Sequence, residues 1–88
     1  MSLEAEFNQY AEKVKSLKQA TNDDLLVLYG LYKQATIGDV NIACPGLFYQ
    51  KDRAKWNSWN GYKGKSKDEA MTDYITKAKQ MLEAAGLA

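Results

Sequence analysis

The chain has 88 residues, enough for one small domain with a modest hydrophobic core. Twelve Lys and Arg residues oppose eleven Asp and Glu residues, and the resulting formal net charge of +1 argues against a strongly basic nucleic-acid-binding protein. With 45% apolar and 26% charged residues, the sequence is too hydrophobic for an intrinsically disordered protein, and it contains no apolar run long enough for a transmembrane helix.

Two residue counts narrow the possible chemistry. The sequence contains no histidine, which excludes the commonest metal ligand and the usual general base at neutral pH. Cys44 is its only cysteine, so neither an intrachain disulfide nor a multi-cysteine zinc site can form. The first twenty residues alternate charged and apolar side chains and do not predict a signal peptide. We therefore expect a soluble intracellular protein that is not an enzyme.

The first half of the chain predicts two helices. From Leu3 to about Leu17, apolar residues recur at spacings of three and four, which places them on one helix face. A second helix is predicted from an Asn22 cap to about Ala35. It is apolar on nearly every side, so we expect it either to be central in the fold or to contact a ligand as well as its neighbours.

The second half predicts a long loop and two further helices. Residues 36–49 contain several turn-forming residues, and we expect the loop's apolar side chains to pack partly onto the core, namely Val40, Ile42, Leu47 and Phe48. A short helix is predicted from Lys51 to Asn60. The last helix begins with a capping box at Ser66 and Glu69 and stops near Gly86. No strand pattern competes, so the expected fold is all-α, with four helices.

The charges are unevenly distributed along the chain. Residues 1–24 carry five acids and three lysines, a net charge of −2, whereas residues 51–67 carry six cations against Asp52 alone, a net charge of +5. The basic stretch also holds Trp56 and Trp59. On the second helix Tyr29 and Tyr32 lie beside Lys33, at helical spacing. If these two surfaces meet, they predict a pocket for a ligand with phosphates and a flat ring.

The same residues also fit simpler roles. Tryptophans spaced three apart, such as Trp56 and Trp59, are often core residues. Lysines in polar stretches are usually just solvated, and Cys44 beside Pro45 reads as an unreactive loop cysteine. Periodicity alone does not choose a ligand.

A longer motif does suggest one. The run YGLYKQATIGDVN at 29–41, then Pro45-Gly46, then KWNSWN at 55–60 closely resembles the acyl-CoA-binding protein family, also known as the diazepam-binding inhibitor or endozepine family. Phe7, the Ala70-Met71 pair and the Tyr74-Ile75 pair extend the likeness over nearly the whole chain. The resemblance implies a single acyl-CoA-binding domain over residues 1–88, folded as a four-helix bundle in up-down-down-up order. It also implies a cytoplasmic monomer that carries long-chain fatty-acyl-CoA esters, maintains a pool of them and delivers them to acyl-CoA-consuming enzymes and membranes, with no cofactor, metal or nucleic acid bound.

The resemblance also nominates site residues. It implies that Tyr32 stacks on adenine and that Lys33 and Lys55 meet the ribose 3′-phosphate. The other implied nucleotide contacts are Lys15, Tyr29, Gly30, Leu31, Lys51 and Tyr74, of which Tyr29 and Tyr74 would hold the nucleotide and Lys15 and Lys51 would lie at the rim. The acyl-groove candidates are Phe7, Tyr10, Ala11 and Leu26.

Three alternatives stay open from the sequence. A nucleotide- or nucleic-acid-binding module would use the same basic and aromatic segment. A peptide-signalling role would need no ligand site. An enzyme would need a nucleophile or base, and the sequence offers no such constellation.

Overall fold

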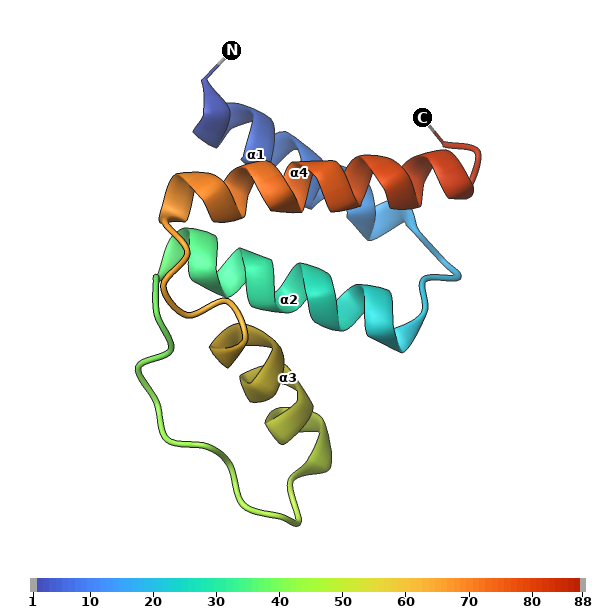
Figure 1. Cartoon of the computed structure of the whole chain (residues 1–88). Coiled ribbons are helices and arrows are strands. Elements are labelled where there is room, and N and C mark those ends of the chain that lie inside the picture. Colours follow the sequence, from blue (N-terminus) through green and yellow to red (C-terminus); the bar gives the residue numbers. More distant parts are fainter. Residues whose placement is uncertain (1, 88) are drawn as a thin grey trace.

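The structure is a computed structural model that describes residues 2–87. It contains four α-helices: α1 (Leu3–Lys13), α2 (Asn22–Thr36), α3 (Gln50–Asn60) and α4 (Lys67–Ala84). A short 3-10 turn, η1 (Val14–Ser16), follows α1, and residues 2–87 contain no strand. In Figure 1, α1 and α4 run from left to right while α2 and α3 return, which is the up-down-down-up order expected of the all-α fold.

The helices pack as a chain of neighbours rather than as a closed square. Helix α2 packs against both α4 and α3, and α1 packs against α4 (Figure 1). The backbones of α1 and α2 do not approach each other closely, so these two helices meet only through side chains. The all-round apolar character of α2 is thus explained by its central place, because it has to cover two neighbours.

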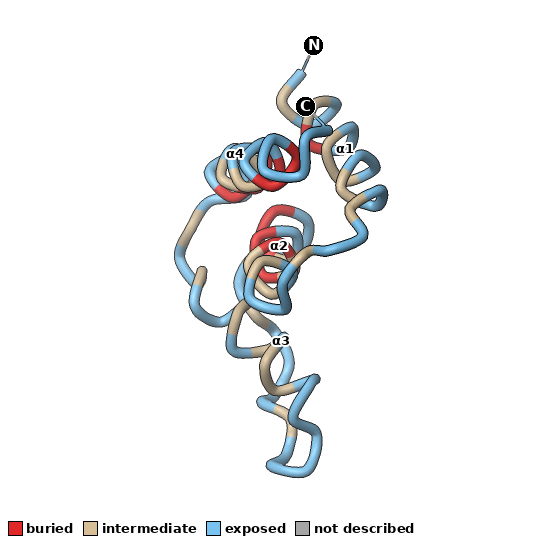
Figure 2. Tube along the Cα trace, turned by 90° about the vertical axis from the view of Figure 1, so that its right-hand side faces the viewer, coloured by how far each residue is buried: buried red, intermediate tan, exposed pale blue. Residues whose placement is uncertain are grey.

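The core lies where α1, α2 and α4 meet. Its buried side chains are contributed at helical spacing by all three helices, as the red segments of Figure 2 show: Phe7, Leu28, Leu31, Ala35, Ala70, Tyr74, Ile75, Ala78 and Met81. The phenyl ring of Phe7 stacks on Tyr32, with centroids 5.5 Å apart, and meets Tyr74 edge-on at 5.0 Å. This aromatic trio joins α1 to α2 through side chains, although their backbones stay apart.

The boundaries of α4 agree with expectation. The Ser66 hydroxyl accepts a hydrogen bond from the Glu69 amide at 3.1 Å, and the Glu69 carboxylate accepts one from the Ser66 amide, which completes the capping box. At the other end Gly86 adopts a φ of 74°, and the Leu87 amide donates to the Leu82 carbonyl at 2.8 Å. This is a Schellman stop, in which glycine avoids the strain of the left-handed conformation.

Two other helix boundaries differ from expectation. The first α-helix ends at Lys13 rather than near Leu17, because the chain tightens into η1, where the Ser16 hydroxyl donates to the Lys13 carbonyl at 2.8 Å. The cap of α2 is Thr21 rather than Asn22, since the Thr21 hydroxyl accepts from the Asp24 amide at 3.1 Å. Threonine and asparagine can both cap a helix, so the residue types alone do not predict which of the two is the cap.

The loop between α2 and α3 is fixed by polar contacts from both helices. The indole of Trp59 is buried and donates to the Gly38 carbonyl at 2.7 Å, and the indole of Trp56 donates to the Ile42 carbonyl at 2.8 Å. The two tryptophans therefore anchor the loop. The expectation that the loop's apolar side chains pack onto the core is wrong for Ile42, Leu47 and Phe48, which are all exposed, whereas Val40 is half-buried.

A second anchor joins this loop to the segment before α4. The buried amide of Gln34 donates to the Asp39 carboxylate at 2.9 Å and to the Lys65 carbonyl at 2.8 Å. The same carboxylate accepts from the Gly64 amide at 2.8 Å. The Gly64 and Gln34 bonds hold the pKa of Asp39 below its ordinary value of 3.8, since they favour the charged form.

The close approach of α3 to α2 depends on a glycine. A β-carbon at Gly30 would lie 2.7 Å from the Ser58 carbonyl oxygen and 2.8 Å from its carbonyl carbon, and still closer to the Ser58 hydroxyl. That hydroxyl donates to the Leu26 carbonyl. Because the obstructing atoms include backbone, a side chain at position 30 would push the two helices apart.

We predict that Gly30→Ala destabilises the protein, although alanine is the better helix former by about 1 kcal/mol. The clash with Ser58 should lower the free energy of unfolding by about 1–3 kcal/mol. Urea unfolding would measure the loss. Gly46→Ala is the control, since a β-carbon there meets only Tyr49 at 3.8 Å. An equal effect in both variants would contradict this account of the α2–α3 contact.

We also predict a pH-dependent cost for Asp39→Asn. The folded pKa of Asp39 is lowered, so its charge stabilises the fold above pH 3.8, and this contribution is lost as the pH falls through the still lower folded value. The variant should be less stable than the parent at neutral pH, and the gap should shrink in acid. Urea unfolding of both proteins at neutral and at acid pH tests this. All other carboxyl groups are common to the two proteins, so their titration cancels in the comparison. A gap that stays constant with pH would refute the role of the charge.

Candidate functional site

A groove runs between α1 and α2, with α4 beneath it. It has a volume of about 540 Å³, and most of its lining is apolar or aromatic. The lining residues come from α1 with the turn that follows it, from α2, and from α4: Asn8, Ala11, Glu12, Val14, Lys15, Leu25, Leu28, Tyr29, Tyr32 and Tyr74. The groove exists because α1 and α2 both pack on α4 while their own backbones stay apart. Its lining suits a ligand with a long apolar part.

Two lysines flank one tyrosine at the α2–α3 side of this groove. The Lys33 ammonium lies 6.0 Å from the centre of the Tyr29 ring, and the Lys55 ammonium lies 5.5 Å from it. Lys33 also lies 5.3 Å from the Trp59 ring. Within residues 2–87, neither lysine forms an ion pair. The basic stretch and the second helix therefore meet, which is the condition that the sequence analysis set for a shared pocket, and they leave two cations without a counter-ion.

A smaller hollow of about 220 Å³ continues from Tyr29 towards the loop. It is lined by residues of the loop and of α3, including both tryptophans: Tyr29, Ile42, Pro45, Asp52, Lys55, Trp56 and Trp59. Because Tyr29 borders both spaces, the hollow and the groove are adjacent. A ligand longer than the groove has room to extend past Tyr29.

The aromatic rings of Tyr32 and Tyr74 differ in their access to the groove. Tyr32 is 42% exposed and stacks one face on Phe7. Tyr74 is buried, and this burial raises its pKa to about 12. Its hydroxyl thus stays protonated at neutral pH and can donate a hydrogen bond to an anion.

Several predicted site residues lie together at the groove, while others do not. Lys15 and Ala11 line it, as do Tyr29, Tyr32 and Tyr74. Lys55 lines the smaller hollow but not the groove, while Lys33 and the exposed Lys51 border neither space. Gly30 faces Ser58 and Leu31 lies in the core, so neither presents a side chain to the groove.

Among the acyl-groove candidates, only Ala11 lines the groove itself. Phe7 is buried beneath Tyr32 and Tyr74. The ring of Tyr10 lies 4.7 Å from the Lys13 ammonium and 5.6 Å from that of Lys79, and it packs on the core next to α4 rather than lining the groove. The carbonyl of Leu26 is bonded to Ser58 of α3, and its side chain does not line the groove.

Sequence reasoning missed five lining residues: Asn8, Glu12, Val14, Leu25 and Leu28. The signal for four of them is helical spacing. Asn8 and Glu12 lie on the face that carries Ala11 and Lys15, while Leu25 and Leu28 stand four residues before Tyr29 and Tyr32. Leu25 is 50% exposed, which is unusual for leucine and marks it as an available apolar surface.

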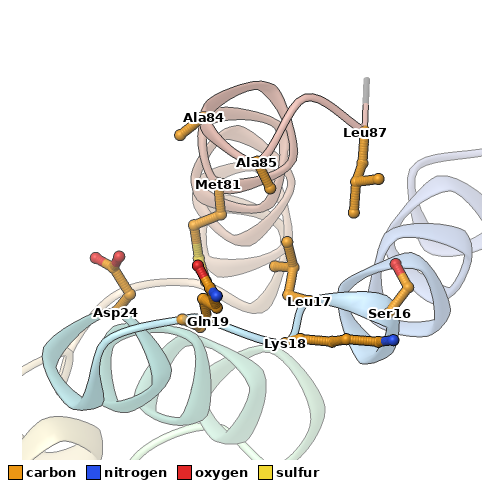
Figure 3. A pocket seen from close by; sticks show the side chains of 10 residues that line it. Ser16, Leu17, Lys18, Gln19, Asp24, Met81, Ala84, Ala85 and Leu87 are labelled. Atoms are coloured by element: carbon orange, nitrogen blue, oxygen red, sulfur yellow. The ribbon is translucent and has the colours of Figure 1, made fainter.

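Another cavity, of about 600 Å³, lies between the α1–α2 link and the end of α4 (Figure 3). Leu17 and Lys18 border it on one side and Met81 and Leu87 on the other, but none of the predicted ligand residues does. Within residues 2–87, no group of His, Cys, Asp or Glu side chains is arranged to hold a metal ion. No helix in that range is long and apolar enough to cross a membrane.

Comparison with known proteins identifies the family. Residues 4–78 match the family described as Acyl CoA binding protein. Acyl-CoA-binding domain-containing protein 1 of Oryza sativa subsp. japonica is 62% identical, with all of this chain and 98% of that protein covered. The acyl-CoA-binding protein of Gossypium hirsutum is 59% identical over 98% of each chain.

Solved structures agree with the sequence relatives. The crystal structure of Oryza sativa acyl-CoA-binding protein 2 matches with a TM-score of 0.93 and 56% identity, over 96% of this chain and 92% of that one. The structure of the acyl-CoA-binding protein from Moniliophthora perniciosa matches with a TM-score of 0.88 and 40% identity, over 97% and 84% of the two chains. This chain therefore belongs to the acyl-CoA-binding protein family.

Proposed function

We propose that this protein binds one long-chain fatty-acyl-CoA, with the nucleotide at the lysines beside Tyr29 and the acyl chain in the groove between α1 and α2. Family membership supports acyl-CoA as the ligand. The observation that carries the placement is the pair Lys33 and Lys55, whose ammonium groups both lie near the ring of Tyr29, a residue that lines the apolar groove. The ligand is likewise anionic at one end and apolar at the other.

The nucleotide part of the proposal depends on the two free cations. Each charge-assisted hydrogen bond from a lysine to the ribose 3′-phosphate would contribute about 1.5–3 kcal/mol. The exposed face of Tyr32 is available for stacking on adenine, because Phe7 occupies the other face. Lys15 lines the groove and would lie at the rim of the nucleotide site. Its ammonium is paired with Glu12 at 2.9 Å, so it would have to exchange partners to bind a phosphate.

The acyl part of the proposal depends on the groove walls. Each methylene group removed from water contributes up to about 0.8 kcal/mol, so a long chain can contribute more than the phosphates do. Leu25, Leu28, Val14 and Ala11 supply the apolar surface for it. The nucleotide would then set the orientation of the ligand while the chain sets most of the affinity.

The proposed role is that of a carrier rather than a catalyst. A carrier has to hold the thioester without hydrolysing it, and this chain has no histidine to act as a general base. We place it as a monomer in the cytoplasm, where it would keep a pool of acyl-CoA and pass it to acyl-CoA-consuming enzymes and membranes. Family membership supports acyl-CoA as the ligand that is carried.

We predict that Lys55→Ala weakens the binding of coenzyme A at least several-fold, because it removes one partner of the 3′-phosphate. Titration calorimetry with coenzyme A and with dephospho-coenzyme A tests the assignment. Dephospho-coenzyme A should bind the parent and the variant alike. The matched control is Lys67→Ala, which removes a lysine of the same basic stretch that borders neither space. If the parent binds both compounds equally, the 3′-phosphate is not recognised there.

We predict that palmitoyl-CoA binds orders of magnitude more tightly than coenzyme A, and that Leu25→Ser reduces this preference by about fivefold. The variant loses apolar groove surface but no nucleotide contact, so its affinity for coenzyme A should stay unchanged. Ile37→Ser is the control, because Ile37 is an exposed apolar residue at the opposite, C-terminal end of α2 and borders none of the three cavities. Equal affinity of the parent for the two ligands would refute burial of the acyl chain.

A further inference from the structure

Two lysines lie beside the ring of Tyr10, one from its own helix and one from α4. The ammonium of Lys13 lies 4.7 Å from the ring centre, and that of Lys79 lies 5.6 Å from it. Both lysines are exposed, while Tyr10 is half-buried and packs on the core. We call these three residues the Tyr10 patch. None of them lines the groove, the hollow or the cavity at the end of α4, so the proposed acyl-CoA site does not explain their arrangement.

The patch repeats the arrangement at Tyr29, where Lys33 and Lys55 also converge from two helices on one ring. Within the described part of the chain, the lysines at the two tyrosines form no ion pair, whereas three other lysines each bind a carboxylate. The fold thus holds two pairs of cations beside a tyrosine without a counter-ion, and only the pair at Tyr29 lies beside the groove.

The side chain of Lys79 is directed to the ring rather than to a neighbouring acid. Glu83 lies four residues further along α4, at a spacing where lysine and glutamate can pair. In residues 2–87 no such pair forms, and the Lys79 ammonium lies over Tyr10 instead. Lys13 has a structural role as well, since a cation is favourable in the last turn of α1. That role does not account for Lys79, which lies more than a turn before the end of α4.

Two like charges beside one ring favour an anionic partner. The ammonium groups of Lys13 and Lys79 both lie within 5.6 Å of the ring centre, so they repel each other, and a bound anion relieves that repulsion. Glu12 is adjacent to Lys13 in the sequence, but it lies on the groove side of α1 and is paired with Lys15 at 2.9 Å. It therefore does not neutralise the patch.

Acidic residues flank the patch at its two ends. Glu6 lies one helical turn before Tyr10, and Glu83 lies one turn after Lys79. Because α1 and α4 run in the same direction (Figure 1), these two acids lie towards opposite ends of the patch. A short anionic group fits between them, whereas a long polyanion such as a nucleic acid would also meet the acids and be repelled.

We propose that the Tyr10 patch is a docking surface for an acidic segment of a partner protein, with carboxylates of that segment bound by Lys13 and Lys79. A small molecule would be left largely exposed there, because the patch borders none of the three cavities. A lipid bilayer fits poorly, since none of the large apolar side chains that are exposed in residues 2–87 lies on α1 or α4. A protein supplies carboxylates together with the further contact area that an open patch requires.

Docking at the patch leaves the ligand groove open. Ala11 lines the groove, but its neighbour Tyr10 faces α4. In Figure 2, α1 and α4 lie side by side at the end of the molecule opposite to α3, the helix that carries Lys55. A partner can therefore bind the loaded protein beside the α1 wall of the groove without touching the nucleotide lysines, a consequence that rests on the proposed function.

The test is an NMR titration of the isotope-labelled chain with a hexaglutamate peptide, with and without excess coenzyme A to occupy the proposed nucleotide site. The amide signals of residues 9–14 and 76–83 should shift under both conditions. Signals near Tyr29 should respond to the peptide only when coenzyme A is absent. High salt should weaken the binding of the peptide, because exposed charges are screened. If coenzyme A fails to bind, the shifts at the patch still decide the proposal, so its failure and that of the proposed function are distinguishable.

A pair of double variants separates the patch from the overall charge. Lys13→Gln/Lys79→Gln should weaken peptide binding about fivefold or more. Lys63→Gln/Lys67→Gln is the matched control and should bind nearly as the parent does. It removes the same total charge from two exposed lysines that, within residues 2–87, lie beside no ring and in no ion pair. Palmitoyl-CoA should bind both double variants as it binds the parent, which shows that the fold is intact.

Three results would overturn the proposal. The first is equal peptide binding by the two double variants, which would make the effect one of net charge alone. The second is a set of peptide-induced shifts confined to the basic stretch at 51–67. The third is a stronger response of the patch signals to phosphatidylserine vesicles than to the peptide, which would identify a bilayer as the partner.

Discussion

The absence of a side chain at Gly30 sets the distance between α2 and α3, and the site depends on that distance. Because the α3 backbone at Ser58 lies against Gly30, Trp59 becomes buried and its indole reaches the Gly38 carbonyl. The same approach brings Lys55 to within 5.5 Å of the Tyr29 ring centre. A packing contact thus decides whether cations from two helices share one tyrosine, and the family motif at Gly30 is better explained by helix packing than by ligand contact.

The groove has a different origin, because α1 and α2 both pack on the same helix, α4. Both α1 and α2 satisfy their apolar faces on α4, so neither needs the other, and the space between them stays open. Phe7, Tyr32 and Tyr74 bridge that space with rings rather than with a helix contact. Such a bridge leaves an apolar wall on either side of it. The groove is therefore a consequence of the helix order and needs no strained backbone.

The sequence predicted the helices well, because apolar spacing and helix capping depend only on residues that are close together along the chain. The capping box at Ser66 and the stop at Gly86 need only neighbouring residues. Neighbouring residues do not determine, however, which distant helix a side chain will face. Tyr10 and Ala11 are adjacent on α1, yet one packs next to α4 and the other lines the groove. The burial of Phe48 was wrongly expected because hydrophobicity suggests a core position but does not reveal whether the backbone brings the side chain there.

The near-neutral total charge conceals how the lysines are used. Within residues 2–87, Lys65 pairs with Asp73 and Lys77 with Asp24, whereas Lys33 and Lys55 form no ion pair and lie beside aromatic rings. A cation–π contact at a partly exposed site contributes about 0.5–1 kcal/mol, less than the 1.5–3 kcal/mol or so of a charge-assisted hydrogen bond. The rings can therefore hold the two ammonium groups in place without competing with a phosphate. A carboxylate partner would have to be displaced before a phosphate could bind, as Glu12 would be at Lys15. The lack of an ion pair at Lys33 and Lys55 within residues 2–87 therefore supports their assignment to the phosphate.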